Sequence, residues 1–333
     1  MDPISQGVLG AAVSQSVVKE KGHMLPAFIM GWLAGMAADL DILIQSASDP
    51  LLSLEYHRHF THSLSFIPIG SLICAFIFLP FFKKKIPFKT IYLFSFLGYA
   101  THALLDSCTT YGTQLFWPFS NMRISWNNVS VIDPLFTLPL LALILVSLFK
   151  KKNTYARIAF VYAIAYLLFG VLQRERAENA ITMLVKTRGH WPVEISAKPS
   201  FGNVILWKTI YQFQDRFYVD AVKIGFNPKI YPGASIEKFQ WELHTPNIPK
   251  DSVQGRDIER FRWFSSDYLS PHPELNNVLV DMRYSLIPNQ INPLWGIEVN
   301  PAQPDTHVQR KTFHSMSVQS RLEFFKMLFD KEK

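Results

Sequence analysis

The uncharged stretch SLSFIPIGSLICAFIFLPFF, residues 63–82, determines the fold class expected for this 333-residue chain. Its length matches the roughly 20 residues that an α-helix needs to cross a hydrocarbon core of ~30 Å. Five further apolar runs lie in the same half of the chain, at residues 4–18, 24–38, 90–105, 134–149 and 158–172. A buried helix of a soluble protein would explain any one run, but six runs separated by short charged turns predict a membrane domain.

The second half of the chain has the composition of a soluble domain. Residues 204–211 and 216–222 flank a short polar turn, which predicts a β-hairpin. Further strand-like runs occur at residues 261–264, 278–284 and 295–299, and a helix is expected near residues 317–329. The predicted architecture is a polytopic α-helical membrane domain of about six helices, residues 1–173, followed by a small β-rich extramembrane domain, residues 174–333. The second domain is expected to cover a pocket, to contact substrate headgroups, or only to stabilise the protein.

Basic residues indicate how the apolar runs are oriented. If all six runs cross the membrane, the turns 19–23, 83–89 and 150–157 share one face and carry ten lysines and arginines. The loops on the other face carry only Arg58 and Arg123. By the positive-inside rule the lysine-rich face is cytoplasmic, so both termini and the second domain are expected in the periplasm or outside the cell. The formal charge of +7 is thereby explained by topology, and no nucleic-acid partner is expected.

Histidine and aspartate residues gather at the outer face that this topology defines. They are Asp39 and Asp41 after the second run, His57, His59 and His62 before the third, and His102 and Asp106 at the end of the fourth. The spacing of His102 and Asp106 places both side chains on one helix face, one turn apart. Carboxylates at apolar helix ends are costly to bury without a partner, and together with imidazoles they form a typical zinc-binding set. The sequence therefore predicts a zinc site of one or two ions, with manganese or iron as alternatives, held by Asp39, Asp41, His57, His62, His102 and Asp106.

Taken singly, each of these residues has an ordinary structural explanation. Asp39 and Asp41 could mark the end of a membrane segment, and His57 could be a solvated loop residue. His59 is expected to be a bystander, since two of the three loop histidines suffice. Arg58 stands between two predicted ligands, where its guanidinium could bind an oxyanion such as phosphate or form a salt bridge with a neighbouring aspartate.

The same motifs resemble those of the membrane-bound metal-dependent hydrolases related to YdjM and YbcI. The resemblance extends over about residues 1–125 and rests on the opening ten residues, Asp39-x-Asp41, His57-Arg58-x-x-Thr61-His62-Ser63 and His102-x-x-x-Asp106. That family is itself distantly similar to the all-α zinc phospholipase C and P1 nuclease group, which cleaves phosphoesters. The resemblance implies zinc at the predicted ligands. Many members have a histidine where this chain has Gln6, so one or two ions are expected rather than three.

These observations predict a hydrolase of the cell inner membrane that acts on a phosphoester, in a phospholipid or another lipid-linked substrate. Arg58 and Asp41 are the catalytic candidates, Arg58 to stabilise negative charge and Asp41 as a general base. A transporter with an intramembrane ion path is the main alternative, but its polar residues should occupy both faces. A scaffold protein with a purely structural metal is the third possibility.

Overall fold

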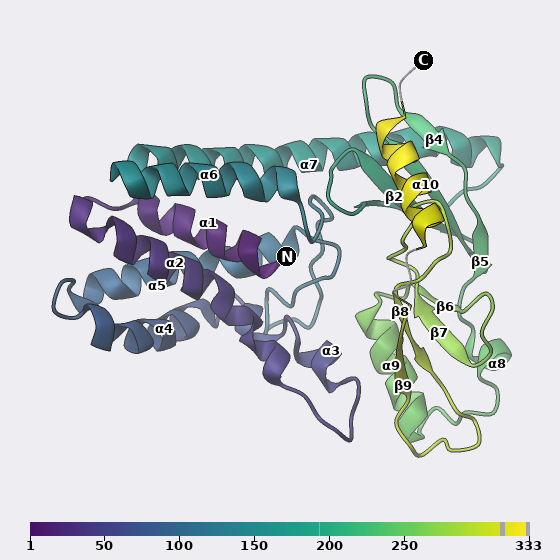
Figure 1. Cartoon of the computed structure of the whole chain (residues 1–333). Helices are drawn as coiled ribbons and strands as arrows, with labels where there is room; N and C mark the ends of the chain where they lie inside the picture. Colours follow the sequence, from purple (N-terminus) through teal and green to yellow (C-terminus); the bar gives the residue numbers. More distant parts are fainter. Residues whose placement is uncertain (193, 314–316, 331–333) are drawn as a thin grey trace. The chain divides into compact units, whose positions relative to one another are not determined.

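A computed structural model describes residues 1–192, 194–313 and 317–330 of the chain. They form two compact units (Figure 1). The helical unit consists of Met1–Leu43, Tyr56–Val171 and Phe201–Asn203, and the β-rich unit consists of Ile44–Glu55, Leu172–Ser200 and Val204–Lys333. The division falls within one long helix, α7 (Asn153–Thr187), whose two ends belong to different units.

Every one of the six apolar runs forms a helix in the structure. The helices are α1 (Pro3–Ser16), α2 (Met24–Met36), α4 (Ile67–Phe82), α5 (Phe88–Ser107), α6 (Pro134–Lys150) and α7. Among the described residues, two segments qualify as single membrane spans by length and composition, Lys21–Leu43 and Asn153–Thr187, and the pair Leu52–His62 and Ile67–Phe82, bent by 87°, would be a third. With 14 residues, α1 is about 21 Å long, short of the hydrocarbon core. The helical, membrane-associated character is confirmed, whereas about six crossings are not.

Glycines allow three of these helices to pack closely. A Cβ atom on Gly10 of α1 would lie 2.3 Å from the carbonyl oxygen of Gly31 in α2, and one on Gly98 of α5 would lie 2.5 Å from the same oxygen. Side chains at these positions would therefore clash with the backbone, and only small residues permit this approach. As a result, the last turns of α2 and α5 lie close enough to share polar contacts.

The β-rich unit contains two antiparallel sheets. In the first, β1 (Ile195–Pro199), β2 (Leu206–Phe213), β3 (Arg216–Lys223) and β4 (Lys229–Tyr231) pair in order, and β5 (Ser235–Glu237) also pairs with β3. The second sheet has the order β6 (Leu269–Pro271), β7 (Val278–Asp281), β8 (Trp295–Glu298) and β9 (Gln309–Thr312). The helices α8 (Trp241–His244), α9 (Val253–Phe264) and α10 (Val318–Phe329) complete this unit. The expected hairpin is the β2–β3 pair, so the β-rich prediction is confirmed.

The strand expected at residues 261–264 is wrong, because these residues form the last turn of α9. Ser252 caps this helix by accepting a hydrogen bond from the backbone amide of Gly255. Ile258, Phe261 and Phe264 recur at a helical period and are buried together. The short aromatic run looked like a strand because its period is visible only when the preceding turn is included.

Candidate metal centre

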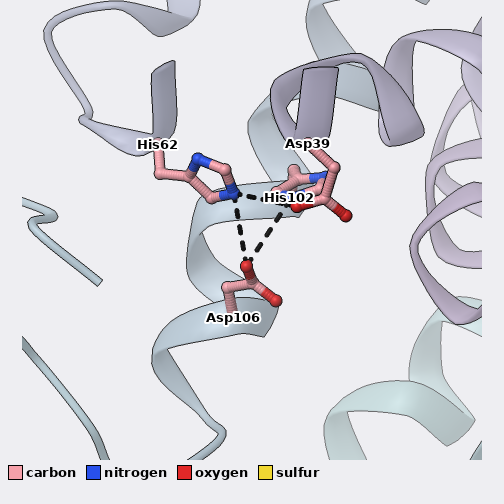
Figure 2. Close-up of side chains that lie close together, drawn as sticks. All are labelled: Asp39, His62, His102 and Asp106. Atoms are coloured by element: carbon pink, nitrogen blue, oxygen red, sulfur yellow. Dashed lines mark ion pairs between the residues drawn. The ribbon is translucent and has the colours of Figure 1, made fainter. Parts of the chain in front are cut away.

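Four of the predicted ligands come together in one cluster within the helical unit. Asp39 lies in the 3₁₀ segment η2 (Ala37–Leu43) that continues α2, and His62 ends the segment η3 (Phe60–His62). His102 and Asp106 lie one turn apart on α5. Figure 2 shows that the four side chains point toward one another. Each offers one ligand atom, and all four atoms lie within 4.8 Å of one another.

The four nitrogen–oxygen distances within this cluster match those expected around a single tetrahedral ion. His62 Nε2 lies 3.3 Å from Asp39 Oδ1 and 3.3 Å from Asp106 Oδ2. His102 Nε2 lies 3.3 Å and 3.6 Å from the same two oxygens. A zinc ion with bonds of ~2.0–2.1 Å to nitrogen and oxygen requires tetrahedral neighbours about 3.3–3.4 Å apart. The residues therefore fit a bound divalent cation.

The hydrogen-bonding state of the cluster gives a second, independent indication. Among the described residues, the buried atoms His62 Nε2 and His102 Nε2 have no hydrogen-bond partner. Asp106 Oδ2, which faces both, lies 2.9 Å from Arg58 Nε. Buried polar atoms are normally satisfied, so unsatisfied atoms that face one another require an explanation. Protonated imidazoles would form the ion pairs drawn in Figure 2. A cation between neutral imidazoles and carboxylates would satisfy all of these atoms at once.

The opposite nitrogen of each imidazole ring is already engaged. His102 Nδ1 lies 2.5 Å from the carbonyl oxygen of Gly35, which can only accept a hydrogen bond. His62 Nδ1 lies 3.1 Å from Asp41 Oδ2. With both Nδ1 atoms donating, the Nε2 lone pairs face the cluster. Metal-binding histidines are commonly oriented by such contacts.

Asp41 and His57 lie beside this cluster rather than in its centre. Asp41 Oδ1 is 2.8 Å from His57 Nδ1, and Asp41 Oδ2 accepts hydrogen bonds from Thr61 Oγ1 at 2.8 Å and from the backbone amide of Arg58 at 2.9 Å. Both carboxylate oxygens are therefore occupied within the loop. Asp39, Asp41 and His57 also form a separate group that satisfies the same 4.8 Å criterion. The six predicted ligands are thus adjacent. Four of them face one another in the cluster, whereas Asp41 and His57 contact each other beside it.

Arg58 forms the salt bridge that was one of its two expected roles. Its side chain is buried, with Nε 2.9 Å from Asp106 Oδ2. Nη1 donates to Thr109 Oγ1 at 2.9 Å, and the guanidinium lies 4.6 Å from the centre of the Tyr111 ring. The backbone of Arg58 is left-handed, with φ of 64°, an uncommon conformation for a residue other than glycine. This turn directs its amide to Asp41 and its side chain to Asp106.

Several contacts of the centre were not predicted from the sequence. Gln6 Nε2 donates to Asp106 Oδ1 at 2.8 Å, and the α-amino group of Met1 donates to the same oxygen. Gln6 had a sequence signal, since it falls on the same face as the ligands. The contact with the carbonyl oxygen of Gly35 had no sequence signal, because a backbone oxygen is present at every residue. His59 lies outside both groups of candidate ligands, and its ring contacts Tyr56, Phe60 and Trp117.

Comparisons with known proteins agree with the family resemblance. The model of the family described as YdjM inner membrane protein matches residues 1–177. The uncharacterized protein YfhP of Bacillus subtilis is 29% identical over 126 residues, which cover 38% of each chain. The inner membrane protein YbcI of Escherichia coli is 32% identical over 105 residues, covering 30% of this chain and 60% of YbcI. No solved structure matches the chain. Because the family model covers more than half of its residues, the chain belongs to the YdjM family of inner membrane proteins.

Proposed function

We propose that this protein is a membrane-bound metal-dependent hydrolase whose centre binds one divalent cation. Zinc is the first candidate, with manganese or iron as alternatives. The observation that carries the proposal is the convergence of two imidazole nitrogens and two carboxylate oxygens at tetrahedral spacing. The ligands would be His62, His102, Asp39 and Asp106. A second ion would require Asp41 and His57 to exchange their 2.8 Å contact for metal bonds, so we favour a single ion.

A cation bound at this centre would supply Lewis acidity and an activated water for hydrolysis. The surrounding residues then have distinct tasks. Arg58 holds Asp106 in place and limits the accumulated negative charge. Asp41 fixes the His62 ring through Nδ1, and its occupied oxygens favour this orienting role over that of a general base. Asp39 is the most exposed of the four ligands, at 20% of its side chain, so substrate would approach on its side.

The neighbourhood of Asp39 supports a lipid or lipid-linked phosphoester as substrate. Leu40 and Leu43 in the same 3₁₀ segment are 63% and 74% exposed. This segment is the last part of the candidate span Lys21–Leu43, so its exposed apolar side chains would contact lipid at the end of that span. The ligand positions would then lie near lipid headgroups, with the β-rich unit on the same, non-cytoplasmic side by the positive-inside rule.

The proposal is tested by metal analysis and hydrolysis assays on the purified full chain. Wild-type protein should contain about one equivalent of metal and cleave phospholipid or bis-aryl phosphate. The variant His102→Ala should lose both properties, whereas His59→Ala, from the loop but outside the cluster, should keep both. Equal metal content in wild type and His102→Ala would contradict the site. Bound metal without hydrolysis of either substrate would instead support a structural role.

A further inference from the structure

The segment Ile44–Glu55 connects the two arms of the metal centre but belongs to the β-rich unit. The arm before it carries Asp39 and Asp41, and the arm after it carries His57 and His62. The segment includes the short helix α3 (Leu52–Tyr56), apart from its last residue. The chain segment that links the two arms therefore belongs to the β-rich unit, whereas the proposed ligands belong to the helical unit.

A single arginine makes most of the polar contacts that hold this segment. Arg260, on α9, donates from Nη1 and Nη2 to the two oxygens of Asp49, at 3.1 and 2.9 Å. It also donates from Nε and Nη2 to Glu55 Oε2, at 3.1 and 2.8 Å. Arg260 thus contacts the middle of the connecting segment and its C-terminal end. Glu55 is only two residues before His57, so its position bears directly on the second arm.

The buried carboxylate of Asp257 orients the side chain of Arg260. Its Nη1 donates to Asp257 Oδ1 at 2.9 Å, one turn earlier on α9. The other oxygen of Asp257 accepts hydrogen bonds from His307 Nδ1 at 2.8 Å and from the backbone amide of Val308 at 3.1 Å. Asp257 therefore fixes the orientation of the guanidinium plane that contacts Asp49. Bidentate pairs in such a network are more specific than isolated surface ion pairs.

The same geometry argues against a metal ion at this position. Asp49, Asp257 and His307 satisfy the distance criterion for a metal-binding group. The guanidinium of Arg260 already contacts both aspartates and supplies the positive charge that a metal would bring. The group is better explained as a clamp on the connecting segment.

We propose that Arg260 is a positioning residue for the metal centre. By holding Asp49 and Glu55, it fixes the second half of the segment, which leads directly into the arm with His57 and His62, and so limits the positions open to that arm relative to the arm with Asp39. Without this clamp the segment would sample more conformations, and bringing the ligands together would cost more conformational entropy. This inference rests on the proposed metal-dependent function.

The test compares zinc affinity and backbone exchange in the full-length protein. Arg260→Ala should weaken zinc binding about 10-fold, the lower end of the effect seen for residues that hydrogen-bond metal ligands, because Arg260 acts through the connecting segment; zinc affinity is measured by competition with a chelator. Amide hydrogen exchange in residues 44–55 should become faster. Arg260→Lys, which keeps the charge but not the planar fork, should restore only part of the affinity. Arg262→Ala is the matched control, because Arg262 lies in the same region and its ion pairs among the described residues are with Asp267 and Glu259 and not with the segment.

A second variant changes Asp49, the partner of Arg260 in the connecting segment. Asp49→Asn removes the bidentate partner without altering α9, so it decides the question if Arg260→Ala does not fold. Faster exchange in residues 44–55 with zinc affinity within about twofold of wild type would overturn the inference while leaving the proposed function intact. Wild-type protein that binds none of zinc, manganese and iron would overturn the proposed function and this inference together. Cobalt substitution adds a spectroscopic readout, since a shifted ligand-field spectrum in Arg260→Ala would report altered ligand geometry.

Discussion

Replacing Asp41 tests the distinction between residues that bind the metal and residues that orient its ligands. In the structure, Asp41 Oδ2 holds His62 Nδ1 at 3.1 Å, while Oδ1 holds His57 Nδ1 at 2.8 Å. Asparagine has the same shape but carries no charge and can accept hydrogen bonds through only one of these two positions. The ring of His62 would therefore be held less firmly, with no loss of a metal ligand.

The expected magnitude follows from these contacts. Exchanging a charged acceptor for a neutral one should weaken metal binding about 10-fold, or about 1.4 kcal/mol. Asp41→Ala removes the acceptor entirely and should approach the ~100-fold limit for residues that support metal ligands. Zinc affinity is measured by chelator competition in detergent, and the amount bound at saturation by elemental analysis. Both variants should still bind one equivalent at saturation.

Asp133→Asn provides a control of the same chemistry elsewhere in the helical unit. Asp133 is buried and caps α6 through the backbone amides of Leu135 and Phe136. Because asparagine caps a helix about as well as aspartate, this replacement should lower stability by less than about 1 kcal/mol and leave zinc affinity unchanged. If Asp41→Asn abolished one full equivalent of bound metal, Asp41 would be a direct ligand and our division of roles would be wrong. Unchanged affinity in Asp41→Ala would equally refute the orienting role.

Three further predictions concern the rest of the chain. Burial lowers the pKa of Lys208 to about 7 and that of its cross-strand neighbour Lys198 to about 8. The unfolded chain therefore binds these protons more tightly, so stability should rise between pH 7 and 10. In Lys208→Met, the free energy of unfolding, measured by thermal unfolding at several pH values, should rise less steeply, by up to about 1.4 kcal/mol per pH unit. Gly98→Ala places a Cβ atom 2.5 Å from the Gly31 carbonyl oxygen and should cost about 1–3 kcal/mol, measured by thermal unfolding in detergent, whereas an unchanged midpoint would refute the close approach. In a background without Cys74 and Cys108, a single cysteine at Lys84 should react with impermeant reagents only from the cytoplasmic side, and the opposite result would invert the topology.

The helices were predictable because long apolar runs leave few alternatives to helical structure in a membrane. The end of α7 was not anticipated, since the apolar run stops near residue 172 while the helix continues to Thr187. Its extension has a signal in retrospect: Ala177, Ile181 and Val185 recur every four residues and are almost fully buried. Polar residues between them mask this amphipathic period in a search for uncharged runs.

The members of the candidate site were predictable, but their division of labour was not. An aspartate pair with one residue between its members does not reveal which carboxylate faces the cluster. That choice depends on the 3₁₀ geometry of η2, which directs Asp39 to the histidine Nε2 atoms and Asp41 to the loop. The position of residues 44–55 in the β-rich unit was equally hidden, because the segment's contacts include Arg260, more than 200 positions away in the sequence. Contacts of this kind depend on the complete fold and not on local patterns.

The most direct test of the central claim is anomalous X-ray diffraction at the zinc absorption edge, on crystals of the full chain purified with its metal. Our account predicts one peak about 2 Å from His62 Nε2, His102 Nε2 and the carboxylates of Asp39 and Asp106. A peak bound instead by Asp41 and His57 would contradict the assigned ligands. Absence of any peak in protein that still hydrolyses phosphoesters, with manganese and iron also excluded at their own edges, would contradict the metal centre itself.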